Sequence, residues 1–378
     1  MKTAPRHIIE QLQDKSSSSI PQLLAFIAEV VLVLTSVYLP LYAYSIGANE
    51  LMVGFIAGAN SVTYIFIPFF AGRLSDKVGQ SKLLVVGFGM ITLSCVSYYL
   101  ILQPVIFIPI RLFEGLGWAL IWPSLEALIG ANSNRLRTFN VMWGIGATIA
   151  PFIGGFISQQ FLTKDIFLVT TSLASISFLF CKFTKQKSSQ KFEGEPKKGN
   201  INHLVFYYPL LYGVASLTFV TFFPIHLYSK GISMLEVGSV LTLMNLGRLV
   251  AFSLPNGLRE RLKGGLSVLA LTLLIGIFPA LTLLDLPTYL IYLETFSFGS
   301  CLGIMYSIAL NEIMGMAVNN RGYYTGLFES ILGAGFFLGP MLGGALASLS
   351  LQYVFLMPLA FTLPFSIVIG ISLRNRWP

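Results

Sequence analysis

Residues 146–155 read GATIAPFIGG, and residues 335–344 read GFFLGPMLGG. The two stretches share their first glycine, a central proline and a closing pair of glycines, and they lie 189 residues apart, half of the 378-residue chain. Further residues recur in the same order at an offset of 185 or 186: Gly72 and Gly79 as Gly257 and Gly264, and Glu126 as Glu312. These repeated signals indicate that the chain is built from two related halves.

The composition points to a membrane protein. Hydrophobic residues make up 55% of the chain, charged residues only 11%, and the mean hydropathy is +0.76, whereas a soluble domain carries about 25% charged residues. About twenty apolar residues span a bilayer as a helix. Twelve such runs are found, at residues 21–47, 51–74, 83–102, 104–131, 138–161, 164–182, 204–229, 234–258, 265–284, 287–316, 323–348 and 352–373.

These runs predict an all-α integral membrane protein in which twelve transmembrane helices form two pseudo-symmetric six-helix bundles. If the N-terminus is cytoplasmic, the cytoplasmic segments hold 20 of the 24 basic residues, as the positive-inside rule requires. We therefore expect a multi-pass protein of the cell (plasma) membrane with both termini inside. The expected parts are a tail (1–20), the first bundle (21–182), a cytoplasmic linker (183–203), the second bundle (204–373) and a short tail (374–378).

Covalent chemistry is not expected. The cysteines Cys95, Cys181 and Cys301 lie far apart in apolar runs, and no nucleophile–base or metal-ligand spacing stands out. No phosphate-binding loop of the G-x-x-x-x-G-K-[ST] type occurs, so ATP is excluded as the energy source. The net charge of +8 is explained by topology rather than by nucleic acid. We expect no enzyme, no cofactor, no metal and no nucleic-acid partner.

The segment 72–82 reads GRLSDKVGQSK and resembles G-x-L-[AS]-D-[RK]-x-G-[RQ]-x-[RK], a signature of the major facilitator superfamily. Helix number, linker and repeat agree with that family over essentially the whole chain. The resemblance implies that Asp76 caps the helix at 323–348 and that Lys77 or Lys82 pairs with Glu126. The alternative is a solvated turn that only sets topology. The expected gating residues are Gly72, Arg73, Asp76, Lys77, Gly79, Lys82 and Glu126.

The repeated glycine–proline stretches fall within two of the helices. Glycines at this spacing allow close helix packing, and a proline inside a helix kinks it. The first copy resembles the family's antiporter motif, G-x-x-x-G-P-x-x-G-G, with Ala150 in place of one glycine. This favours antiport, and helix packing alone is the alternative. The expected hinge and packing residues are Gly146, Pro151, Gly154, Gly155, Gly335, Pro340, Gly343 and Gly344.

Three residues are candidates for proton coupling. Arg111 and Glu114 stand three residues apart in the run 104–131. Residues 111–115, RLFEG, resemble the family's R-x-x-x-G motif. They could instead simply neutralise each other. Glu29 is the first choice for a carboxyl group that binds and releases a proton, because burial makes its charge costly, and Glu114 is the second. A permanently protonated, hydrogen-bonded Glu29 is the alternative.

A substrate cavity is expected between the bundles. The family resemblance implies that four helices line this cavity, those at 21–47, 104–131, 204–229 and 287–316. Aromatic walls suit an amphipathic solute, although such stripes also serve packing. The acids that pair with Arg111 and Arg248 are left open, and Glu312 is expected in a gate or a structural ion pair. The candidate cavity residues are Tyr38, Trp118, Trp122, Tyr208, Tyr212, Asn245, Arg248, Glu294 and Glu329.

The favoured function is secondary active transport by alternating access, in which protons drive the efflux of small amphipathic compounds. The first rival is proton symport or uniport of a metabolite such as a sugar or organic acid, with Arg111 or Arg248 holding an anionic substrate. A lipid flippase or a non-transporting receptor is an alternative of another class. The expected partners are a small-molecule substrate, protons and the lipid bilayer, and the family resemblance implies a monomer.

Overall fold

A computed structural model of the protein describes residues 6–129, 133–184, 203–254, 256–284, 286–316 and 321–374. Every regular element in these ranges is a helix. The N-terminal half contains α1 (Arg6–Ser45), α2 (Glu50–Val78), α3 (Gln80–Leu100), α4 (Phe107–Ile129), α5 (Ser133–Gln160) and α6 (Ile166–Phe180). The C-terminal half contains α7 (Tyr207–Ser229), α8 (Met234–Phe252), α9 (Asn256–Leu262), α10 (Gly265–Leu281), α11 (Thr288–Met316), α12 (Arg321–Ala347) and α13 (Met357–Arg374).

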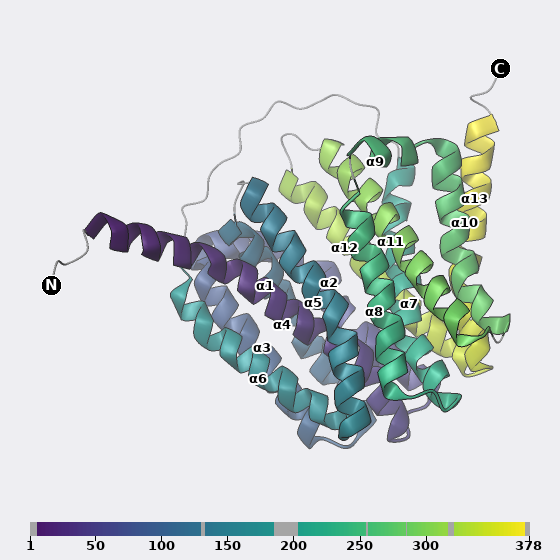
Figure 1. The fold of residues 1–378 in the computed structure, drawn as a ribbon, viewed down its shortest axis with the longest axis horizontal. Coiled ribbons are helices and arrows are strands. Elements are labelled where there is room, and N and C mark those ends of the chain that lie inside the picture. Colours follow the sequence, from purple (N-terminus) through teal and green to yellow (C-terminus); the bar gives the residue numbers. More distant parts are fainter. Residues whose placement is uncertain are drawn as a thin grey trace.

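Twelve of the helical segments in the described ranges are long and apolar enough to cross a membrane. Figure 1 shows them as two bundles side by side, with α1 to α6 in one and α7 to α13 in the other. The expected fold class is therefore confirmed. Short 3₁₀ helices extend several spans: η1 (Pro104–Ile106), η2 (Thr163–Asp165), η3 (Cys181–Phe183), η4 (His203–Phe206), η5 (Thr282–Leu284) and η6 (Leu351–Leu356).

Several helix ends differ from the expected ones. Helix α1 begins at Arg6, inside the expected tail, and Figure 1 shows its start projecting from the bundle. Helix α2 continues to Val78, so that the expected loop shrinks to Gly79, whose φ of 98° is accessible to glycine at little cost. The run 234–258 divides into α8 and the short α9.

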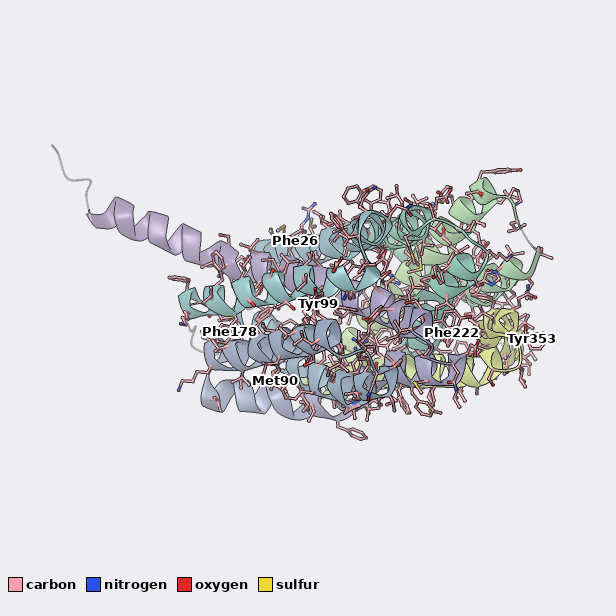
Figure 2. The ribbon with its side chains drawn as sticks, turned by 90° about the horizontal axis from the view of Figure 1, so that it is seen from below. Phe26, Met90, Tyr99, Phe178, Phe222 and Tyr353 are labelled. Carbon is pink, nitrogen blue, oxygen red and sulfur yellow. The ribbon has the colours of Figure 1, made fainter. Side chains whose placement is uncertain are left out.

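The outward faces of α3, α6, α10 and α13 are apolar. Exposed side chains include Leu93 on α3, Leu179 on α6, Leu266 on α10 and Ile367 on α13. Figure 2 shows side chains over the outside of both bundles, with Met90 and Phe178 labelled on the first. Contiguous exposed apolar surface of this kind marks contact with another apolar phase, and in a chain with twelve spans that phase is lipid.

The two glycine–proline repeats hold the bundles together in matching ways. On α5, a methyl group at Gly154 would overlap the ring of Tyr38 on α1, whereas one at Gly155 would overlap the Met234 carbonyl on α8. On α12, Gly343 faces Phe222 of α7, and Gly344 faces Gly54 of α2. Each helix therefore packs its own bundle with one glycine and the opposite bundle with the next.

The remaining residues of the two repeats follow the same rule. A methyl group on Gly146 would meet the Phe26 carbonyl of α1, and one on Gly335 would meet the Leu210 carbonyl of α7. The carbonyl oxygens of Pro151 and Pro340 lie against glycines of the opposite bundle, Pro151 against Gly238 and Pro340 against Gly54. Small residues thus let helix backbones approach closely.

The contacts of Gly155 and Gly344 with the opposite bundle lie towards one side of the membrane. They face the carbonyl oxygens of Met234, which begins α8, and Glu50, which begins α2. The opposite side, where α6 ends and η4 leads into α7, is called the linker side below. In Figure 1 the ends of α5 and α8 lie next to each other away from the linker side.

Candidate functional site

A central cavity of about 200 Å³ lies between the two bundles. Helices α1, α2 and α4 line it from one bundle, and α7, α8 and α12 from the other. Trp118, Trp122 and Phe336 contribute aromatic surface, and leucine, valine and methionine side chains form much of the remainder. Its polar lining residues are Ser36, Asn60, Ser61, Tyr64, Ser216, Asn245, Arg248 and Glu329. Such a mixture of apolar wall and few polar groups is typical of a small-molecule site.

Arg248 of α8 brings a positive charge to the cavity. Its Nη2 donates a hydrogen bond to Ser216 Oγ at 3.0 Å, and its guanidinium carbon lies 5.3 Å from the centroid of the Tyr212 ring, a cation–π distance. Its buried Nε has no hydrogen-bond partner among the described residues. Arg248 therefore retains capacity to bind an acceptor group.

Glu329 of α12 brings a negative charge to the same cavity. Tyr64 of α2 donates a hydrogen bond to Glu329 Oε2 at 3.1 Å, a contact between the two bundles. Glu126 of α4 is exposed and lies near enough to interact electrostatically with Glu329. The bundles thus present acids to each other on the linker side of the cavity.

Arg111 and Glu114 form a buried ion pair within α4. Arg111 Nη1 lies 2.8 Å from Glu114 Oε2, and both side chains are fully buried. Glu114 accepts three further hydrogen bonds, from Tyr98 Oη at 2.6 Å, Thr35 Oγ1 at 3.0 Å and Trp118 Nε1 at 2.9 Å. Arg111 Nε donates to the Ile56 carbonyl at 3.3 Å, and its Nη2 has no partner among the described residues. Four donors therefore converge on one buried carboxyl group.

Glu29 lies on α1 at the interface of the two bundles. Its side chain is half-buried, and it stands near enough to Arg248 of α8 for the two charges to interact. The Cβ of Glu29 also faces Gly146 of α5. Glu29 of the N-terminal bundle therefore interacts with Arg248 of the C-terminal bundle.

Five of the nine expected cavity residues line the central cavity, namely Trp118, Trp122, Asn245, Arg248 and Glu329. Tyr38 instead donates a hydrogen bond to the Pro151 carbonyl at 2.5 Å and packs against α5. Tyr212 lies beneath Arg248, and Tyr208 packs on Phe365 at 5.6 Å between ring centroids. Glu294 lines a separate pocket. These four residues are therefore absent from the cavity wall.

Several residues of the expected cytoplasmic gate have side chains that the structure does not describe. The side chains of residues 68–77, including Arg73, Asp76 and Lys77, are outside the described part of the structure. Lys82 and Glu126 are exposed, and no ion pair between these two described residues is found. In the other half, Lys263 Nζ lies 3.1 Å from Glu312 Oε1. Glu312 therefore belongs to an ion pair, which was one of the two roles expected for it, the other being a gate.

Several functional candidates were not found by sequence reasoning. Thr35 and Tyr98 bind Glu114 from α1 and α3, and Tyr64 binds Glu329 from α2. Nothing in their local sequence signals these contacts. Asn60 lines the cavity opposite Asn245, and this pair could have been found, because it has the repeat offset of 185 residues.

Comparison with known proteins fits this architecture. The family model of the Major Facilitator Superfamily matches residues 23–318. The chain belongs to the major facilitator superfamily. A solved structure of the nucleoside transporter NupG superposes on this chain with a TM-score of 0.77 at 13% sequence identity. The match covers 94% of this chain and 98% of that one. This likeness concerns the fold.

Two relatives of this superfamily member have names that refer to drug resistance. Multidrug resistance protein 2 of Bacillus subtilis (strain 168) is 22% identical over 349 residues, 86% of each chain. The multi-drug resistance efflux pump PmrA of Streptococcus pneumoniae is 30% identical over 147 residues, 36% of each chain. The chain is thus a multi-pass membrane transporter rather than an enzyme, and transporters of this superfamily carry small-molecule substrates.

Proposed function

We propose that this transporter exports small amphipathic compounds in exchange for protons, by alternating access to the central cavity. The observation that carries the proposal is a cavity of about 200 Å³ whose wall comes from both bundles and combines tryptophans with one cation and one acid. Pockets that enclose drug-sized ligands measure about 300–1,000 Å³, so the cavity suits a small solute. The names of the two relatives support efflux.

Glu29 is the proposed proton site. It belongs to α1 and interacts electrostatically with Arg248 of α8, so protonation would remove an attraction between the bundles. Attraction between opposite charges is strong where little water screens it. A proton on Glu29 and a substrate in the cavity would then favour different arrangements of the bundles, which is the requirement for exchange.

Arg111 and Glu114 have a different proposed role. The four donors around Glu114 fix the position of its carboxyl group, and releasing one donor would leave a buried group without a partner. We therefore assign this pair to fixing α4 against α1 and α3, beside the cavity. Trp118 belongs to both assemblies, since it donates to Glu114 and lines the cavity.

The gate follows from the same scheme. Gly155 and Gly344 support closure on the side away from the linker side, and the sequence motif around Asp76 would close the linker side in the alternate state. We further propose that both termini are cytoplasmic, that the membrane is the plasma membrane and that the protein works as a monomer. Reporter fusions at the two termini would test the topology, with a cytoplasmic reporter signal expected from both.

Proteoliposomes test the exchange directly. With an acidic interior, added lipophilic solutes should release internal protons from vesicles that contain the wild-type protein. Glu29→Gln should reduce this release at least about tenfold while solute binding persists, whereas Glu236→Gln, an exposed acid at the start of α8, should leave it unchanged. Proton release at the wild-type rate in Glu29→Gln would exclude Glu29 as the proton site.

Uptake of an anionic metabolite is the second candidate. It is favoured by the buried Nε of Arg248, which lacks a partner among the described residues and borders the cavity. The same vesicles distinguish the two functions: an organic acid that alkalinises the external medium as it enters would indicate symport. Solute movement with no change in pH would indicate uniport.

A further inference from the structure

A second pocket lies inside the C-terminal bundle, on the side opposite the linker side. Its volume is about 130 Å³, and it is formed by α7, α11, the segment between α10 and α11, and Lys230 and Ile232 of the segment between α7 and α8. That volume can hold several water molecules or the few heavy atoms of a small ligand. Apolar walls come from Phe223, Leu227 and Ile291. The pocket shares no lining residue with the central cavity.

Glu294 makes this pocket unusual. Its side chain lines the pocket and is only 4% exposed. Thr282 Oγ1 donates a hydrogen bond of 3.3 Å to Oε1, but Oε2 has no hydrogen-bond partner among the described residues. A buried carboxyl oxygen without a partner is costly, so the pocket has an acceptor that a ligand can satisfy.

The other polar groups of the pocket limit the class of ligand. Lys230 is exposed, and solvent screens its charge. His226 is buried, with its ring 5.2 Å from that of Phe355. The described residues contain no cluster of three or more acidic, histidine or cysteine side chains that could hold a metal ion. Glu294 opposes an anion, so a cation that carries its own N–H donors fits best.

We propose that this pocket is a second binding site, which takes a small protonated amine. The ammonium group donates to Oε2 of Glu294, a charge-assisted hydrogen bond, and the carbon atoms of the amine contact Phe223, Leu227 and Ile291. A quaternary ammonium ion has no N–H to donate and is excluded. A sodium ion would find one carboxyl group and the hydroxyl groups of Thr282 and Thr288, whereas oxygen-ligated cations require more ligands.

Thermal unfolding of the purified full chain in detergent measures this binding. Methylammonium chloride should raise the unfolding midpoint in a saturable manner, because a ligand that binds only the folded state stabilises it. Sodium chloride and tetramethylammonium chloride at equal ionic strength should not. Glu294→Gln should weaken the apparent affinity for methylammonium at least about tenfold, as loss of a charged hydrogen bond implies.

Two control variants locate the site, and one further variant guards against misfolding. Glu329→Gln in the central cavity and Glu236→Gln on the surface should both keep the methylammonium shift. Ile291→Phe, which fills the pocket but keeps the carboxyl group, should abolish the shift even if Glu294→Gln folds poorly. A shift that disappears in Glu329→Gln, persists in Ile291→Phe, occurs equally with sodium or never occurs would overturn the proposal. None of these outcomes depends on proton exchange.

Discussion

Glu114 and Glu294 are buried carboxyl groups on α4 and α11, the equivalent helices of the two halves, yet their surroundings differ. Glu114 is fully buried and accepts four hydrogen bonds, one of them from Arg111. Glu294 is 4% exposed and accepts one long bond, from Thr282. Burial alone therefore does not reveal the role of a charge. The number of donors separates a fixed structural group from one that is available to a ligand.

The arginines show the same contrast. Arg111 is fully buried against its own carboxylate, at 2.8 Å. Arg248 is half-buried, borders the cavity, contacts the Ser216 hydroxyl and the Tyr212 ring, and interacts electrostatically with Glu29 of the opposite bundle. Arg111 is thus neutralised within its own helix, whereas Arg248 keeps binding capacity at the cavity. The four predictions below test that difference through the free energy of unfolding in detergent.

Glu114→Ala should have the largest effect. It leaves the guanidinium of Arg111 buried without a counter-charge, which should lower the free energy of unfolding by about 3–5 kcal/mol. Replacing Arg111 and Glu114 together by methionine should cost clearly less, because no isolated charge remains. Chemical unfolding followed by tryptophan fluorescence measures both. Equal losses of unfolding free energy in the single and double variants would contradict the structural role assigned to the Arg111–Glu114 pair.

Arg248→Met should cost less, because this arginine has weaker partners. The lost contacts are one hydrogen bond, at about 0.5–1.5 kcal/mol, one cation–π contact, at about 0.5–1 kcal/mol, and the electrostatic interaction with the half-buried Glu29. We expect a decrease of about 1–2 kcal/mol in the free energy of unfolding, together with lost binding of anionic solutes in an equilibrium binding assay. A decrease as large as that of Glu114→Ala would show that Arg248 is structural.

Glu294→Gln should change the free energy of unfolding by at most about 0.5–1.5 kcal/mol, since only the bond from Thr282 is at stake. The glutamine amide can still accept that bond, so the change should be near the lower limit. The same unfolding measurement applies, without added amine. A loss of several kcal/mol would mean that Glu294 has an essential structural partner and that the contrast with Glu114 is false.

Lys263→Met should have the smallest effect. Its ion pair with Glu312 has side chains 25% and 42% exposed, and such pairs contribute about 0.2–1 kcal/mol because solvent screens them. A double-mutant cycle with Glu312→Gln isolates the pair energy, and high salt should reduce it further. This value sets the lower limit against which the Glu294 result is compared.

The fold could be predicted because its signals are local and repeated. Twenty-residue apolar runs define helices by length alone, and the offset between the glycine–proline stretches defined the halves. The end of α2 was harder, since residues 72–78 form a polar stretch that reads as a loop, although the helix continues to Val78. A polar helix end carries no hydropathy signal.

The site was predictable only in part. Arg111 and Glu114 are three residues apart on one helix, so their pairing was one of two readings of the sequence. Tyr98 and Thr35 reach Glu114 from other helices, and helix rotation cannot be derived from a single sequence. Tyr38 fits an aromatic cavity stripe equally well, but its hydroxyl group binds the Pro151 carbonyl. Tertiary packing decided each case.

Neighbouring glycines on α5 contact different bodies: Gly154 faces Tyr38 within its own bundle, and Gly155 faces Met234 across the interface. Gly343 and Gly344 repeat this arrangement on α12. Helix packing within a bundle and helix contact between the two bundles therefore depend on separate, adjacent residues. A residue larger than glycine at the first position of each pair should therefore lower the stability of one bundle, whereas one at the second position should hinder the two bundles from closing on each other.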